Sequence, residues 1–207
     1  MPDNENKSQI KSRQRVANHG EVFTNPREVN AMLDLVRDES YRLDSRFLEP
    51  ACGDGNFLIV ILRRKLSLLK DIKSQTEWEF KSLIAVGSCY GIDLLPDNAE
   101  ACRERLFAEV MDQMIKKDCS DGYEESLRYM LQKNIVCGDA LTYRTAEGKP
   151  ITFCVSKHFL LYTDKGKKRD DLCNNSIYKT ILDFTHLFLG SSFPMNEITI
   201  HFPHQKS

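Results

Sequence analysis

The chain has 207 residues, of which 41% are hydrophobic and 29% charged, as in a globular protein of one domain with a sizeable core. Its longest apolar run, residues 57–62, is far short of the roughly 20 residues of a membrane-spanning helix, and its seven cysteines form no Cys-x-x-Cys pair. We therefore expect a cytoplasmic protein with reduced thiols, without metal or membrane contact. The formal net charge of -1 excludes a global basic field, so any contact with nucleic acid must be local or supplied by a partner.

The first residues of the chain predict a flexible tail followed by a helix. Residues 1–18 are polar, with several basic side chains, and are expected to be solvated. Asn25 can cap the helix that follows, and Pro26 suits its first position. The apolar spacing then predicts a buried face on this helix. That face consists of Val29, Met32, Leu33 and Val36.

Further along, strands alternate with helices. Strands are predicted at residues 46–49, 89–93 and 134–137, and helices at about 56–69, 77–86, 96–116 and 124–132. This alternation predicts an α/β fold with a doubly wound, mostly parallel sheet. Beyond about residue 150 histidines accumulate, glutamate almost disappears and helical periodicity fades. We therefore expect one domain over residues 19–150 and an atypical segment over 151–207.

The loop after the first strand carries the strongest functional signal, in the sequence Leu-Glu-Pro-Ala-Cys-Gly-Asp-Gly-Asn-Phe-Leu at 48–58. Gly53 and Gly55 let the backbone turn tightly and approach a ligand, and the next helix directs N–H groups into the same crevice. A dinucleotide fingerprint needs a third glycine or alanine where Leu58 stands. Glu49 would repel a pyrophosphate, but it suits a ligand with an ammonium group. The pattern therefore favours S-adenosylmethionine (SAM) over NAD.

Two acidic residues follow at the ends of the next two strands. Asp93 is placed to accept hydrogen bonds from both ribose hydroxyls of an adenosine cofactor, with Leu94 over the adenine face. Asp139 can accept a hydrogen bond from the adenine amino group, with Ala140 or Leu141 packed on the ring. A helix cap for the first acid and a turn aspartate for the second are the structural alternatives.

Together these motifs resemble the amino-terminal half of an adenine-specific (N6) DNA methyltransferase of the restriction-modification type. Residues 20–26, Gly-Glu-Val-Phe-Thr-Asn-Pro, are similar to the motif that precedes the SAM loop in that family, and the likeness spans roughly residues 16–145. It implies a Rossmann-like methyltransferase fold, with Phe23 and Thr24 at the methionine end of SAM. The implied cofactor-binding residues are Phe23, Thr24, Glu49, Pro50, Ala51, Gly53, Gly55, Phe57, Asp93, Leu94, Asp139 and Ala140.

The catalytic loop of the same family is Asn, Asp or Ser, then Pro-Pro, then an aromatic residue, which together position the flipped base. No two of the seven prolines are adjacent here, and residues 156–159 keep only the ends of that loop. We therefore assign no catalytic residue and expect a partial methyltransferase that contacts DNA only with further domains or a partner chain. A non-catalytic SAM-binding remnant or partner subunit, and a methyltransferase acting on RNA or protein, are the alternatives.

In the methyltransferase sheet that the resemblance implies, the strand that delivers the catalytic loop lies next to the strand at 46–49, and we expect it to be missing here. Without it the strand at 46–49 becomes an edge, which invites self-association unless residues 151–155 or 197–202 supply a replacement. The odd composition beyond residue 150 also fits a premature end or a reading-frame change within a longer gene.

Overall fold

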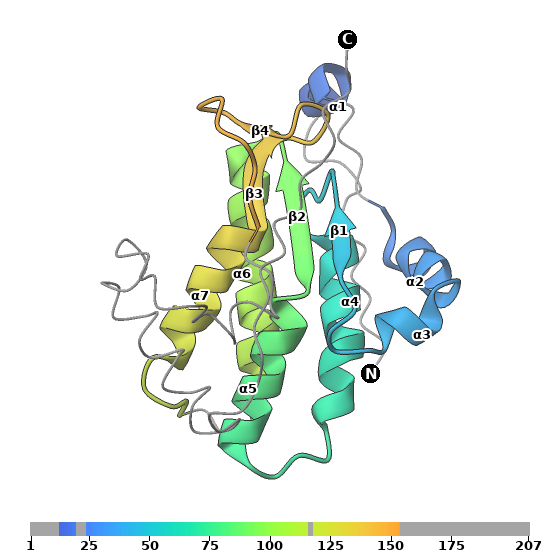
Figure 1. Cartoon of the computed structure of the whole chain (residues 1–207). Coiled ribbons are helices and arrows are strands. Elements are labelled where there is room, and N and C mark those ends of the chain that lie inside the picture. Colours follow the sequence, from blue (N-terminus) through green and yellow to red (C-terminus); the bar gives the residue numbers. More distant parts are fainter. Residues whose placement is uncertain (1–12, 20–23, 116–117, 154–207) are drawn as a thin grey trace, which may run out of the picture.

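The structure, a computed structural model, describes residues 13–19, 24–115 and 118–153. Its strands are β1 (Phe47–Glu49), β2 (Cys89–Asp93), β3 (Ile135–Asp139) and β4 (Arg144–Thr145), in the order β1-β2-β3-β4 (Figure 1). The pairs β1–β2 and β2–β3 are parallel, and β3–β4 is antiparallel. This confirms the three predicted strands and a mostly parallel α/β sheet, to which the hairpin strand β4 is an addition.

The helices lie beside this sheet as the alternation predicts. Helix α6 contacts both α4 and α7, and all three contact strand β2, so they cover one face of the sheet (Figure 1). A doubly wound sheet also needs helices on the other face, so that arrangement stays a prediction. The helices are α1 (Arg13–His19), α2 (Pro26–Asp34), α3 (Arg37–Ser40), α4 (Asn56–Leu66) with a 3-10 turn at Ser67–Leu69, α5 (Gln75–Val86), α6 (Pro96–Gln113) and α7 (Tyr123–Asn134).

Along β2 the second face of the sheet is buried too, although none of the described helices lies on it. Tyr90 and Ile92 alternate along β2 with the residues that face α4, and they are 4% and 0% exposed. The Tyr90 ring contacts the ring of Phe153, with centroids 5.1 Å apart. Residues 151–153 are not a strand, and the rest of the candidate strand 151–155 lies outside the described residues, as do 156–159 and 197–202.

The core between the sheet and the helices is built from the predicted apolar faces of α4 and α6. Helix α2 begins as predicted, because Asn25 Oδ1 accepts a hydrogen bond from the Arg27 N–H at 2.9 Å. Its buried face is narrower than predicted: Met32 and Val36 are 55% and 46% exposed. Val36 lies beyond the last residue of the helix, and Met32 lies off the stripe that packs on α4. The buried core residues of α4, the turn after it and α6 include Leu58, Ile59, Leu62, Leu66, Leu69, Ala99, Cys102, Leu106 and Val110.

A fully buried lysine in α4 forms hydrogen bonds with residues at the amino ends of β1 and β2. Lys65 Nζ donates hydrogen bonds to the carbonyl oxygens of Leu43 and Ser45, at 3.3 and 2.5 Å, and to Ser88 Oγ. Burial lowers the pKa of the Lys65 ammonium. These acceptors take the place of water, which makes the buried ammonium tolerable.

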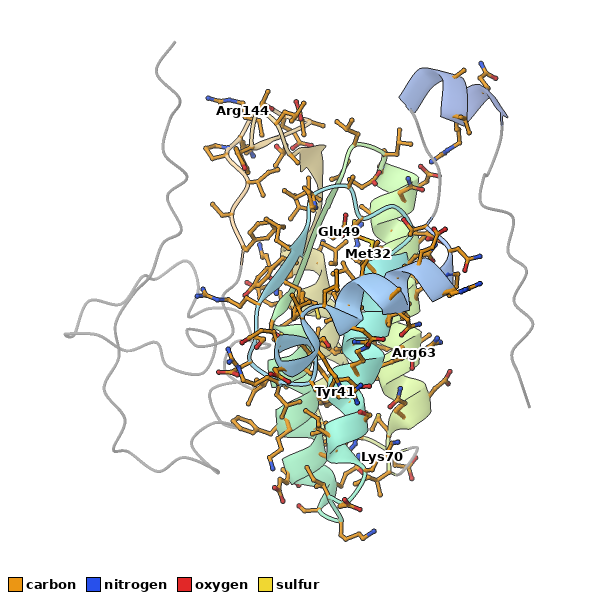
Figure 2. The ribbon with its side chains drawn as sticks, turned by 90° about the vertical axis from the view of Figure 1, so that its right-hand side faces the viewer. Met32, Tyr41, Glu49, Arg63, Lys70 and Arg144 are labelled. Carbon is orange, nitrogen blue, oxygen red and sulfur yellow. The ribbon has the colours of Figure 1, made fainter. Side chains whose placement is uncertain are left out.

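The opposite, carboxyl end of the sheet is where the loops with the predicted ligand residues lie. Figure 2 shows Glu49 toward the same end of the molecule as Arg144, with Lys70 at the far end of α4. Helix α1 lies beyond the tips of the β1 and β2 arrows (Figure 1). It includes the last residues of the expected tail. Within the described ranges, none of the helices has the length and hydrophobicity that a bilayer crossing requires.

Candidate functional site

The loop between β1 and α4 turns at two glycines in the left-handed region, Gly53 with φ 54° and Gly55 with φ 92°. The Gly55 N–H donates to the Cys52 carbonyl at 2.8 Å, and the Gly55 carbonyl accepts from the N–H of Ile59 in α4. A Cβ on Gly55 would lie 2.7 Å from Cys102 Sγ on α6. Gly55 is therefore needed for the turn and for packing against α6.

Arg105, on α6, holds this loop in place. Its Nη1 donates to the Asp54 carbonyl at 2.8 Å and to Asn56 Oδ1 at 3.0 Å, and forms an ion pair with the Asp54 carboxylate. Asn56 Nδ2 in turn donates to the Thr24 carbonyl at 3.3 Å. Thr24, just before α2, is thus hydrogen-bonded to Asn56 at the end of the glycine loop, although the two residues are 32 positions apart in sequence.

Asp93, at the end of β2, joins the glycine loop to the start of α6. Its Oδ2 accepts a hydrogen bond from the Gly53 N–H at 2.8 Å. Its Oδ1 accepts from the Leu95 N–H at 2.9 Å and from Asn98 Nδ2 at 3.1 Å. These bonds are not a helix cap, since Leu95 is the N-cap residue of α6 and no side chain caps that helix. Because a carboxylate oxygen has two lone pairs, Oδ2 can still accept a second hydrogen bond.

Asp139, at the end of β3, makes a local turn. Its two carboxylate oxygens accept from the Leu141 N–H at 2.8 Å and from Thr142 Oγ1 at 3.0 Å. These bonds, the Leu141 one first, lower the pKa of Asp139 below its usual value. The turn leaves Leu141 92% exposed, and Leu94 is 63% exposed. Two apolar side chains near this carboxylate are thus available to a ligand.

Glu49, at the end of β1, is half-buried. Burial raises the pKa of Glu49, and the Ala51 backbone N–H opposes that effect in part. A carboxylate that is costly to ionise gains most from a cationic neighbour. The electrostatics here favour a ligand with a positive charge.

All of these loops meet in one pocket of about 460 Å³ at the carboxyl ends of β1, β2 and β3, a volume in the usual range of small-molecule sites. In parallel sheets this is where ligands bind. The residues that line it are Thr24, Glu49, Pro50, Ala51, Cys52, Gly53, Asn56, Phe57, Asp93, Leu94, Leu95, Asn98, Gly138, Asp139, Ala140 and Leu141.

Two residues from the predicted set are not in this lining. Gly55 serves the turn behind the pocket, and Phe23 lies outside the described residues. Asn98 also lines the pocket, although it is not in the predicted set. Its position four residues before Cys102 puts it on the buried face of α6, where a polar residue needs a partner.

A profile of the family described as MmeI, DNA-methyltransferase domain, matches residues 24–154, well over half of the chain. The chain belongs to this family. The MmeI-domain match takes in Thr24, the glycine loop, Asp93 and Asp139, and it confirms the resemblance to a restriction-modification DNA methyltransferase. Comparisons with curated proteins and with solved structures gave no match.

Proposed function

We propose that this chain is the cofactor-binding part of a SAM-dependent methyltransferase that acts on the N6 amino group of adenine in DNA. The observation that carries the proposal is the single pocket lined by Thr24, the glycine loop, Asp93 and Asp139. These segments are far apart in sequence, and each matches one methyltransferase motif. When bound, SAM supplies the methyl group for transfer.

The chemistry of the pocket fits this cofactor. SAM carries an ammonium, a sulfonium, a ribose diol and an adenine ring. The half-buried carboxylate of Glu49 suits the ammonium and would repel a pyrophosphate. Asp93 Oδ2 can accept from a ribose hydroxyl, and Leu94 and Ala140 offer apolar surface to the ring.

In this proposal the residues of the chain bind and orient the cofactor. Thr24 and Glu49 hold its methionine end, Gly53 allows the close approach of the backbone, and Asp93 and Asp139 hold the nucleoside. The N6 specificity rests on the resemblance of the leading motif and the SAM loop to adenine methyltransferases. Positioning of the target base is left to residues outside the described ranges or to another chain.

Calorimetric titration with SAM and S-adenosylhomocysteine tests cofactor binding. We expect both to bind and NAD not to bind. Asp93→Ala should weaken binding at least tenfold, because one hydrogen bond to a charged acceptor contributes about 1.5–3 kcal/mol. Asp44→Ala is the matched control, since Asp44 pairs with exposed Arg42 before the amino end of β1. Absence of SAM binding by the wild-type chain, or equal binding by a folded Asp93→Ala variant, would refute the assignment.

Transfer of labelled methyl groups tests the target. We expect no incorporation into DNA by this chain alone, because no two of its prolines are adjacent and a Pro-Pro step is part of the catalytic loop. Label on cytosine, RNA or protein would contradict the adenine assignment. Label on adenine N6, lost in Asp139→Ala, would support the target but contradict the need for further domains or a partner.

A partner or a second copy has an evident place to bind. In the described part of the chain, β1 pairs only with β2, so its other edge presents unpaired backbone groups there. We propose that the chain self-associates or binds a partner through this edge. Light scattering that shows a cooperative, well-behaved monomer over a range of concentrations would contradict this.

A further inference from the structure

Arg15, in helix α1, binds the first turn of α6 beside the cofactor site. Arg15 Nη1 and Nη2 donate to the two carboxylate oxygens of Asp97, at 2.9 and 3.3 Å. Nη2 also donates to Asn98 Oδ1 at 3.1 Å. The Arg15 side chain is 26% exposed, and Asp97 and Asn98 belong to the first turn of α6. The planar fork of arginine suits this two-point attachment.

Both the oxygen and the nitrogen of the Asn98 side-chain amide form hydrogen bonds. The side chain is 1% exposed, its oxygen accepts from Arg15, and its nitrogen donates to Asp93 Oδ1 at 3.1 Å. If the amide were reversed, its NH₂ would face the guanidinium and its oxygen would face the carboxylate. Both contacts would be repulsive. Arg15 therefore stabilises the one orientation of Asn98 that donates to Asp93.

We propose that Arg15 is a positioning residue of the cofactor site. By fixing the Asn98 amide it keeps Asp93 Oδ1 engaged on the α6 side, which orients the carboxylate so that the remaining lone pair of Oδ2 is left for a ribose hydroxyl of an adenosine cofactor. The inference rests on the proposed function, in which Asp93 Oδ2 accepts a hydrogen bond from a ribose hydroxyl. Arg15 itself acts through Asn98, two hydrogen bonds away from that carboxylate.

The first test is a double-mutant cycle in calorimetric binding of S-adenosylhomocysteine. We expect Arg15→Ala to weaken binding about three- to tenfold, the usual effect of one lost hydrogen bond, and Arg15→Lys to recover part of it. In the Asn98→Leu background, Arg15→Ala should cause no further loss, because the two residues act in series. Arg42→Ala, which breaks an exposed ion pair with Asp44, is the matched control and should bind as wild type.

The outcomes separate this inference from the proposed function. If the wild-type chain does not bind S-adenosylhomocysteine, the proposed function is overturned and this inference with it. If the wild type binds and Arg15→Ala binds equally well, only the role of Arg15 is refuted. A loss that is the same with and without the Asn98 amide would also refute it, because Arg15 would then act by another route.

A second measurement needs no Asn98 variant, should that variant fail to fold. Coupling between two sites is reciprocal, so a cofactor whose binding is strengthened by the Arg15 contact must strengthen that contact by the same factor. We expect S-adenosylhomocysteine to slow hydrogen exchange of the backbone amides of α1 in the wild type and not in Arg15→Ala. Unchanged exchange in the wild type at saturating ligand would overturn the proposal.

Discussion

Replacement of Gly55 by alanine should lower the free energy of unfolding for two reasons, backbone strain and steric crowding, which can be measured separately. A residue with a Cβ in the left-handed region costs about 1–2 kcal/mol, and the smaller freedom of alanine in the unfolded chain returns about 0.4–1 kcal/mol. In addition the new Cβ would lie 2.7 Å from Cys102 Sγ, which is buried in the core. Overpacking of this kind costs about 1–3 kcal/mol. We expect Gly55→Ala to lower the free energy of unfolding by about 2–4 kcal/mol.

Two other glycines serve as matched controls. Gly148 has φ 76°, and a Cβ there would meet no other atom within 4 Å, so Gly148→Ala carries backbone strain alone and should cost about 1 kcal/mol or less. Gly91 is not among the positive-φ glycines, but a Cβ there would lie 2.9 Å from Cys52 Sγ and 3.0 Å from Leu58 Cδ1. Gly91→Ala therefore carries the steric cost without backbone strain, about 1–3 kcal/mol less the roughly 0.4–1 kcal/mol that the unfolded chain returns.

Urea unfolding followed by circular dichroism measures all three variants at constant m-value. In a Cys102→Ala background the sulfur is gone, so Gly55→Ala should then cost only what Gly148→Ala costs. If Gly55→Ala costs the same in both backgrounds, the contact with α6 is not what restricts this position. If it costs no more than Gly148→Ala in the wild-type background, the steric argument fails outright.

Three further predictions concern charged side chains. Because burial raises the pKa of Glu49, SAM affinity should fall as the pH drops through that raised value, and Glu49→Gln should remove this pH dependence. The same raised pKa means that ionised Glu49 destabilises the fold. In urea unfolding, Glu49→Gln should therefore be more stable than the wild type only above the usual carboxyl pKa. Lys65→Met should lower the free energy of unfolding by about 1–3 kcal/mol, because it leaves the Ser45 carbonyl oxygen without its donor; an unchanged urea midpoint would contradict this. Arg105→Met should weaken SAM binding by releasing the Asp54 carbonyl, whereas Arg63→Met, on the exposed side of α4, should not; equal calorimetric affinities would count against the role of Arg105.

The elements that the sequence predicted well are those with a repeating pattern over several turns or a strand that ends in a recognised motif. Helix α6 is an example, since Ala99, Cys102, Leu106 and Val110 are all buried as their spacing requires. Strand β4 has two residues and no period to detect. It depends on the turn at Gly148, whose N–H donates to the Thr145 carbonyl at 2.9 Å.

The candidate site divides in a similar way. Residues inside contiguous motifs, such as Glu49 and Asp93, could be singled out because their neighbours in sequence identify them. Arg105 could not, because its role depends on a contact with Asp54, 51 positions away, and arginines are common on exposed helix faces. Asn98 was similarly hidden, since only the fold brings it to Arg15. Gly55 was singled out for ligand approach, whereas its nearest side chain is that of Cys102.

The attachment of the glycine loop has a consequence for the entropy of binding. Arg105 donates a hydrogen bond to the Asp54 carbonyl of the loop, and the Cys52 N–H of the loop donates to the Ile92 carbonyl of β2 at 2.9 Å. Ordering one backbone residue costs roughly 1–2 kcal/mol, and here folding rather than ligand association carries that cost. A preorganised loop binds with little loss of chain freedom. Mutations that loosen it should therefore appear first as a more unfavourable binding entropy, even where every atom that touches the ligand is retained.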